Sequence, residues 1–140
     1  MSFINGNGNG NGNGNGHRPK PKNVLGTDLK CCCLQPLTGW FRDGHCRTNA
    51  EDRGMHTVCA LVTSEFLLYL QSQGNDLITP APQFGFPGLV AGDKWCVCAL
   101  SWIDAYKEGV ACPIVLEACD SSVLNHISLA SLKEHAVEDE

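Results

Sequence analysis

Residues 56–74 read HTVCALVTSEFLLYLQSQG, and their pattern changes from a short apolar run to a helical repeat. The apolar run over 56–62 is typical of a short buried strand. Thr63 or Ser64 is suited to cap a helix that follows, and Gly74 stands where a glycine commonly ends one. The expected buried face of this helix consists of Phe66, Leu67, Tyr69 and Leu70. The segment therefore predicts a strand followed directly by a helix.

Further along the chain, shorter elements alternate with irregular segments. Residues 75–94 are rich in proline and glycine and show no clear element, which is typical of a long and often functional loop. The other expected elements are a strand over 95–100, a helix from Ser101 (with Asp104 in a capping box) to Gly109, a strand over 112–118, a helical turn over 121–125 and a helix over 129–136. This order predicts an α+β fold: a small single domain with a mixed sheet of short strands, about three helices and long irregular loops.

The N-terminus has a different composition from the rest. Residues 5–16 are six Asn-Gly pairs, and HRPKPK follows at 17–22. A repeat without apolar side chains has nothing to bury, so we expect residues 1–22 to form a flexible, disordered tether. The folded domain is then expected over 23–140, with a short acidic tail.

Charge and hydropathy exclude two classes of partner. The chain has 10 Lys and Arg against 15 Asp and Glu, and residues 1–22 hold three of the basic residues and no acidic ones. The body is therefore acidic, which disfavours nucleic-acid binding. No apolar run approaches the roughly 18 residues of a membrane span, and no secretory signal is recognisable, so a cytoplasmic protein is expected.

Nine cysteines are the most unusual feature of the composition. In a reducing compartment, and with an odd count, we expect free thiols, packing residues, or metal or catalytic ligands rather than disulfides. Cys96 and Cys98 would face the same side of a strand, where two thiols are suited to a metal or to nucleophilic chemistry. Free cysteine also packs as a small core hydrophobe, and this alternative stays open.

A second group of polar residues lies between positions 43 and 59. Asp43 and Cys46 belong to the motif DGHC, and His56 and Cys59 form H-x-x-C. Aspartate, histidine and cysteine are all competent metal ligands or acid–base groups. In the run 31–33 all three residues are cysteines, whose side chains point in different directions, so at most one or two of them are expected to be functional.

Two acidic residues have a simpler interpretation. Asp76 follows the end of the first helix, and Asp93 follows Gly92 before a strand. Asp76 is suited to close a turn on its own backbone, and Gly92-Asp93 is typical of a tight turn that leads into a strand. The segment FGFPGL at 84–89 either lines a pocket or fills the core.

Several motifs occur in one order along most of the chain. They are NVLGTDL (23–29), PLTGWFRDGHC (36–46), HTVCA (56–60), GNDL with TP (74–80), FPGL (86–89), GDKWCVCA with Trp102 (92–102) and LKEHAV near the end. Together they resemble the bacterial and plant family of domain-of-unknown-function 2237. The resemblance implies a small standalone domain and no particular activity. It marks Cys32, Asp43, Cys46, Asp52, His56, Cys59, Asn75, Asp76, Asp93, Cys96 and Cys98. It also implies a departure at His45, where family members often have another cysteine, and it sets apart Cys31, Cys33, Cys112 and Cys119.

These observations lead to two hypotheses. The first is a site lined by Cys, His and Asp that binds a metal, zinc or iron, or acts through a thiolate. Its expected metal ligands are Cys46, His56, Cys59, Cys96 and Cys98, and its candidate catalytic groups are Asp43, His56, Asp76 and Asp93. The alternative is a non-catalytic module that binds a small molecule or a protein, with its cysteines in the core. A hydrolase or isomerase that uses Asp76 with His56 is a third interpretation.

Overall fold

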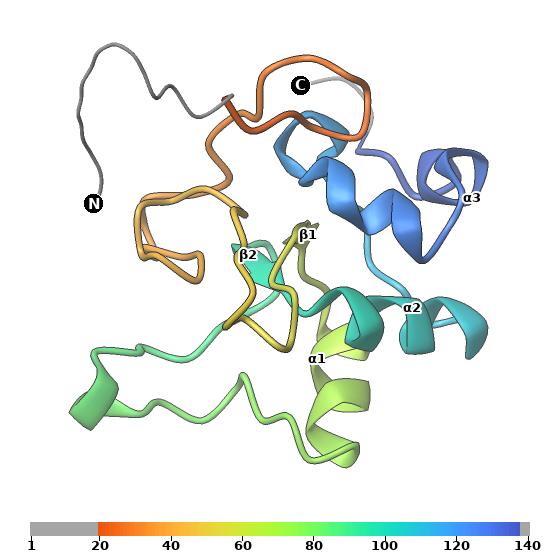
Figure 1. The fold of residues 1–140 in the computed structure, drawn as a ribbon. Helices are drawn as coiled ribbons and strands as arrows, with labels where there is room; N and C mark the ends of the chain where they lie inside the picture. Colours follow the sequence, from red (N-terminus) through yellow and green to blue (C-terminus); the bar gives the residue numbers. More distant parts are fainter. Residues whose placement is uncertain (1–19, 138–140) are drawn as a thin grey trace, which may run out of the picture.

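A computed structural model describes residues 20–137 (Figure 1). The expected tether, apart from residues 20–22, and the acidic tail lie outside this range. The helices and strands follow in the order β1 (Val58–Leu61), α1 (Ser64–Ser72), β2 (Lys94–Val97), α2 (Ala99–Lys107) and α3 (Leu129–Lys133). Three 3₁₀ helices, η1 (Pro82–Phe84), η2 (Leu116–Ala118) and η3 (Ser121–Asn125), lie between them. The α+β class is confirmed.

The sheet lies at the centre of the molecule and consists of β1 and β2 in antiparallel pairing (Figure 1). Cys59 is the register partner of Cys96, and Val58 that of Val97. The other edge of β1 is covered by the chain near Ile114, because Leu61 N–H donates to the Pro113 carbonyl and Val115 N–H donates to the Cys59 carbonyl, both at 2.9 Å. β1 is therefore hydrogen-bonded on both edges.

Helix α1 forms as its sequence predicts. Thr63 adopts an extended conformation as N-cap, and its Oγ1 accepts a hydrogen bond from Phe66 N–H at 3.1 Å. Phe66, Leu67 and Leu70 are buried against the core. The last helix, α3, is capped by Ser128, whose Oγ accepts from Ser131 N–H, and it ends at Lys133 rather than at the expected residue 136.

The prediction for the start of α2 is wrong. The strand ends at Val97 rather than at residue 100, and the helix begins at Ala99 instead of Ser101. Cys98 is the N-cap without a side-chain cap, and its carbonyl accepts the helical hydrogen bond from Trp102 N–H. Ala99 N–H donates to the Met55 carbonyl at 2.9 Å, which turns the chain out of the strand at this point. Tertiary contact thus overrides the capping-box pattern.

The strand expected over 112–118 is also wrong. Ile114 makes only isolated bridges, to Ala60 and Ala136, and residues 116–118 form η2. Pro113 has no N–H to donate to a ladder, which limits regular pairing here.

The long loop over 75–94 is held by its own side chains. Asp76 Oδ1 accepts from Ile78 N–H and Thr79 N–H, and Asp93 Oδ2 accepts from Val90 N–H. Only part of the segment 84–89 reaches the core: Leu89 is buried and Phe86 packs on Trp95 with ring centroids 5.2 Å apart, whereas Phe84 is exposed. The predicted turns at Asp76 and Asp93 are confirmed by these hydrogen bonds.

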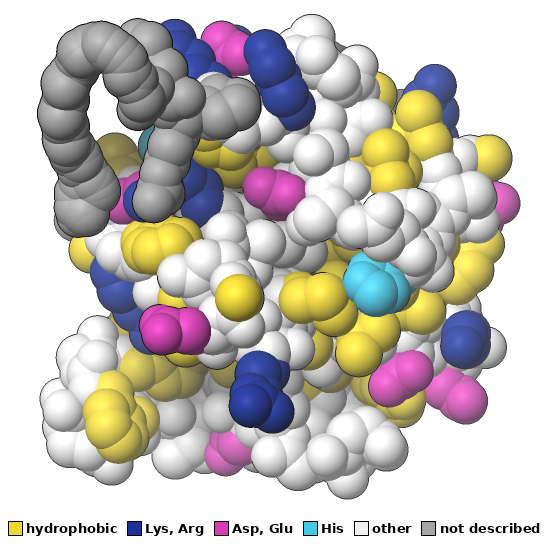
Figure 2. Space-filling view, viewed as in Figure 1, with side chains coloured by type: hydrophobic (Ala, Val, Ile, Leu, Met, Phe, Trp, Pro, Cys, Tyr) yellow, Lys and Arg dark blue, Asp and Glu magenta, His cyan; other side chains and the backbone are white. Residues whose placement is uncertain are grey.

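Two observations concern a membrane and nucleic acid as partners. Among residues 20–137, no helix has the length and apolar character needed to cross a membrane. On the face shown in Figure 2, Lys and Arg side chains are scattered among acidic and apolar ones.

Gly88 provides a test of the loop. Its φ is +81°, and a Cβ there would lie 2.5 Å from the Ile78 carbonyl oxygen. We expect Gly88→Ala to lower the free energy of unfolding by about 2–3 kcal/mol, because steric overlap is added to left-handed strain. Gly85→Ala is the matched control, since Gly85 also has a positive φ but open space around it, and it should cost about 1–2 kcal/mol. Urea unfolding of both variants measures the difference, and equal losses would contradict the steric argument.

Candidate functional site

Four cysteines from separate segments meet on one side of the sheet. Cys59 and Cys96 are directly opposite each other on β1 and β2, so their side chains leave the same face. Cys32 and Cys46 reach this face from the loops that precede β1. All four are buried, with exposed fractions of 0–6%. We refer to these four residues as the cysteine centre.

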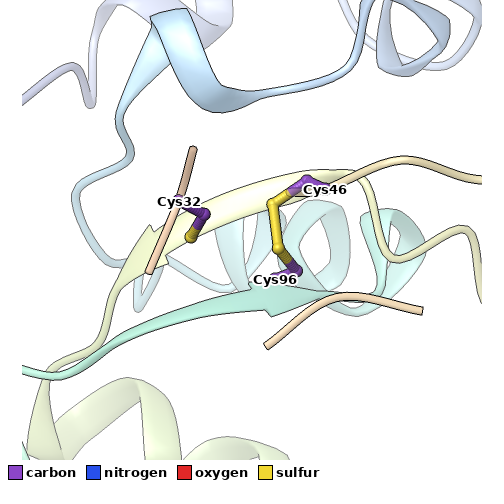
Figure 3. A group of neighbouring side chains, drawn as sticks. All are labelled: Cys32, Cys46 and Cys96. Atoms are coloured by element: carbon purple, nitrogen blue, oxygen red, sulfur yellow. A yellow bond between two sulfur atoms is a disulfide. The ribbon is translucent and has the colours of Figure 1, made fainter. Parts of the chain in front are cut away.

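The structure pairs the four sulfurs as two disulfides, Cys32 with Cys59 and Cys46 with Cys96. The Sγ atoms of Cys32, Cys46 and Cys96 lie within 4.8 Å of one another (Figure 3). The expectation of unpaired thiols is therefore wrong for these residues, because the sheet register and the covering loops bring them into contact. The remaining five cysteines are free.

Backbone contacts hold the covering loops on the centre. The N–H groups of Cys32 and Cys33 both donate to the Gly44 carbonyl, at 2.6 and 3.2 Å. Cys96 N–H donates to Oγ1 of the buried Thr38 at 2.9 Å. A side chain at Gly44, whose φ is +87°, would lie 2.7 Å from Leu34 Cδ2. The glycine lets the two loops approach each other closely.

The centre overlaps with the expected metal ligands only in part. It contains Cys46, Cys59 and Cys96, while His56 and Cys98 lie outside it. Cys32 was not among the expected ligands. The signal that could have found it is the family resemblance, which marks Cys32 but not Cys31 or Cys33. In the structure Cys32 is buried, Cys31 is exposed and Cys33 is half-buried.

The free cysteines whose pKa is shifted are held as neutral thiols. Burial raises the pKa of Cys112 and of Cys119 to about 12, which fits packing residues of the core. Partial burial, with Cys33 and Asp43 nearby, also raises the pKa of Cys31. A raised pKa reduces the thiolate fraction, so none of these three is an activated nucleophile.

His56 is held by a buried carboxylate. Its Nδ1 lies 2.7 Å from Asp52 Oδ1, and its backbone N–H donates to Asp52 Oδ2 at 2.9 Å. Thr48 Oγ1 donates to the same oxygen at 3.0 Å. Burial acts to raise the pKa of Asp52, but these hydrogen bonds and the charge of His56 outweigh it and lower the pKa below its ordinary value. Asp52 therefore stays ionised, and His56 is paired with it rather than with Asp76.

Asp43 is engaged in local contacts. Its Oδ1 accepts from His45 N–H at 3.0 Å, and its Oδ2 accepts from Arg47 Nε at 2.9 Å. Asp43, His45 and Arg47 line a surface cavity of about 330 Å³ together with Lys20 and Asp28. Asp28 in turn pairs with Lys22 at 2.8 Å. The acidic groups of this cavity are thus matched by neighbouring cations.

Asp52→Asn tests the role of the buried carboxylate. At neutral pH we expect the free energy of unfolding to fall by about 2 kcal/mol, because the half-buried donors on Thr48 and His56 lose a charged acceptor. Since the folded-state pKa of Asp52 is lowered, its contribution is complete above the unfolded value near 3.8 and is lost as pH falls through the folded value. Thermal unfolding from pH 7 to pH 2 measures this. The wild-type and variant curves should converge in acid, and a difference independent of pH would contradict it.

Comparison with known proteins places this arrangement in a family. No curated protein matches the chain significantly. A family model described as an uncharacterized protein conserved in bacteria, DUF2237, matches residues 22–136. This range contains the cysteine centre, Asp52 and His56, and it spans most of the chain. The protein belongs to the DUF2237 family.

Proposed function

We propose that the cysteine centre binds one zinc or iron ion when it is reduced, and that oxidation converts the same four cysteines to two disulfides. The observation that carries the proposal is the convergence of buried sulfurs within 4.8 Å from segments far apart in the sequence. The site is a redox-dependent metal centre rather than a hydrolytic one.

The spacing of the sulfurs suits a tetrahedral ion. A Zn–S bond of about 2.3 Å requires sulfurs about 3.8 Å apart at the corners of a tetrahedron. The sulfurs of Cys32, Cys46 and Cys96 lie within 4.8 Å of one another, and Cys59 is bonded to Cys32. Small side-chain rotations after reduction would therefore open enough space for an ion among the four sulfurs.

The chemistry of the ligands limits the choice of ion. Thiolates favour zinc, iron and other soft or borderline ions over magnesium or calcium. Because the centre is buried, thiolate charges are unfavourable there without a cation. Metal binding should therefore release protons. A closed set of four thiolates leaves no open coordination position, which is typical of structural rather than catalytic zinc.

Oxidation and metal binding compete for the same atoms. Formation of two disulfides removes four electrons from the four thiols and releases four protons, and a thiol oxidant such as diamide accepts both. Sulfurs joined in this way no longer serve as thiolate ligands, so oxidation expels the ion. In the cytoplasmic location that the sequence predicts, the reduced form would predominate.

The burial of the centre favours a second candidate, a non-catalytic module whose disulfides are purely structural. They close sequence separations of 27 and 50 residues. In the chain-entropy model, each alone would stabilise the fold by about 3–4 kcal/mol. This candidate predicts no metal binding in any redox state.

Cobalt binding distinguishes the two candidates. We expect the reduced protein to take up one Co²⁺ per chain, with thiolate-to-metal charge-transfer absorption and the strong visible bands of tetrahedral cobalt. Cys46→Ser and Cys96→Ser should abolish this spectrum. Cys98→Ser and Cys112→Ser are matched controls, because they remove thiols outside the centre, and circular dichroism verifies folding. Failure of the wild type to bind would overturn the proposal, and loss of binding in Cys98→Ser would overturn this ligand set.

Stability in the two redox states gives a separate test. Reduction should lower the melting temperature of the metal-free protein, because two cross-links are lost. Added Zn²⁺ should restore it for the reduced protein and leave the oxidised protein unchanged. Titration with diamide should release the ion as two equivalents are consumed. An equal effect of Zn²⁺ on both redox states would show binding elsewhere.

A further inference from the structure

A second arrangement, separate from the cysteine centre, surrounds His56. We propose that His56 Nε2 acts as a general base on water, hydrolysing esters of aromatic alcohols whose ring lies on the indole of Trp40, with Asp52 as the positioning residue. The proposal does not depend on metal binding by the cysteine centre.

Asp52 fixes which nitrogen of the imidazole is available. Because the carboxylate is ionised and lies 2.7 Å from Nδ1, that nitrogen carries the proton in the neutral ring. Nε2 then carries the lone pair. No group in the described part of the chain forms a hydrogen bond to Nε2, and 36% of the side chain is exposed. The reactive nitrogen therefore has access to water.

The surrounding backbone fits this one ring position. A Cβ at Gly54 would lie 2.9 Å from Cε1 of His56, so a side chain there would displace the imidazole from its position beside Asp52. Met55 has a φ of +53°, a left-handed conformation that is unfavourable for a non-glycine residue. Such strained positions concentrate at functional sites. If Asp52 and His56 served only to hold the loop, the hydrogen bond from the His56 backbone N–H to the carboxylate would suffice. An oriented and exposed imidazole ring would not be needed.

Trp40 indicates the class of ligand. Its indole is nearly parallel to the imidazole, at an interplanar angle of 15° with centroids 6.2 Å apart, and 42% of the residue is exposed. An aromatic ring on this indole would gain stacking and apolar contact. An ester attached to that ring would bring its carbonyl carbon near Nε2, where a water molecule has room to approach.

The reaction needs no cofactor. Nε2 takes a proton from water while the water oxygen bonds to the ester carbonyl carbon. The bond from that carbon to the aryl oxygen breaks, and the imidazolium returns the proton to the departing phenolate. The products are a carboxylic acid and a phenol, and His56 regains its starting state. The negative charge of Asp52 stabilises the transient imidazolium.

Hydrolysis of p-nitrophenyl acetate tests the proposal. Steady-state rates with excess substrate exclude the stoichiometric acetylation of exposed thiols and lysines. We expect His56→Gln to lower the rate about tenfold or more, and Asp52→Asn and Trp40→Leu to lower it by smaller factors. His45→Gln is the matched control, because His45 is equally exposed, at 36%, and its ring lies near a carboxylate that is 37% exposed rather than buried. It should retain the wild-type rate.

Two measurements on the wild type remain decisive if a variant fails to fold. Nitrogen-15 NMR should show the neutral His56 ring protonated at Nδ1, and hydrolysis should be slower in D₂O because a proton is in transit. Equal rates for His56→Gln and His45→Gln, or a ring protonated at Nε2, would overturn the proposal. So would an acetyl group accumulating on His56, which would show nucleophilic attack.

Discussion

The register of β1 and β2 is the constraint on which the rest of the structure depends. Only the pairing of Cys59 with Cys96 places both sulfurs at the same height on one face. A slip by one residue on either strand would turn that strand's sulfur to the opposite face. The two loops that carry Cys32 and Cys46 would then find no partners on the sheet. A sheet of only two short strands is marginal by itself, so the two disulfides at this point compensate for its size.

The same pairing also determines where the histidine lies. β1 begins at Val58, and the chain that enters it runs through Asp52 and His56. Ala99 N–H bonds to the Met55 carbonyl where β2 turns into α2, so the loop with the histidine is tied to the second strand as well. The cysteine centre and the imidazole are therefore separate sites built from one pair of strands. A change in strand register would disturb both, whereas a change in one side chain should disturb only one.

Sequence patterns predicted the elements that are determined by residues close together in the chain. The helix that begins after Thr63 and the turns at Asp76 and Asp93 could be inferred from neighbouring residues and short motifs. Contacts between residues far apart in the sequence could not be predicted in this way. Cys32 joins Cys59 across 27 residues, and the start of α2 depends on a hydrogen bond from Ala99 to Met55. His56 was considered with Asp76, although its partner is Asp52, four residues away. That spacing also occurs in ordinary loops and carries no distinctive signal.

The burial of the cysteine centre limits how fast an oxidant, a reductant or a metal ion can reach its sulfurs. The four cysteine residues are 0–6% exposed, so an oxidant, a reductant or a metal ion reaches their sulfurs only when a covering loop opens. The loop before Cys46 is held by the Thr38 hydroxyl, by the Gly44 carbonyl and by Arg42, whose guanidinium lies 5.3 Å from the centroid of the Trp95 ring. Each of these contacts contributes only about 1 kcal/mol, so opening is local and far less costly than global unfolding. The Cys46–Cys96 disulfide, when formed, ties the loop before Cys46 to the sheet and so prevents this local opening. A reductant should therefore reach the oxidised centre slowly, whereas an oxidant or a metal ion should reach the reduced centre quickly.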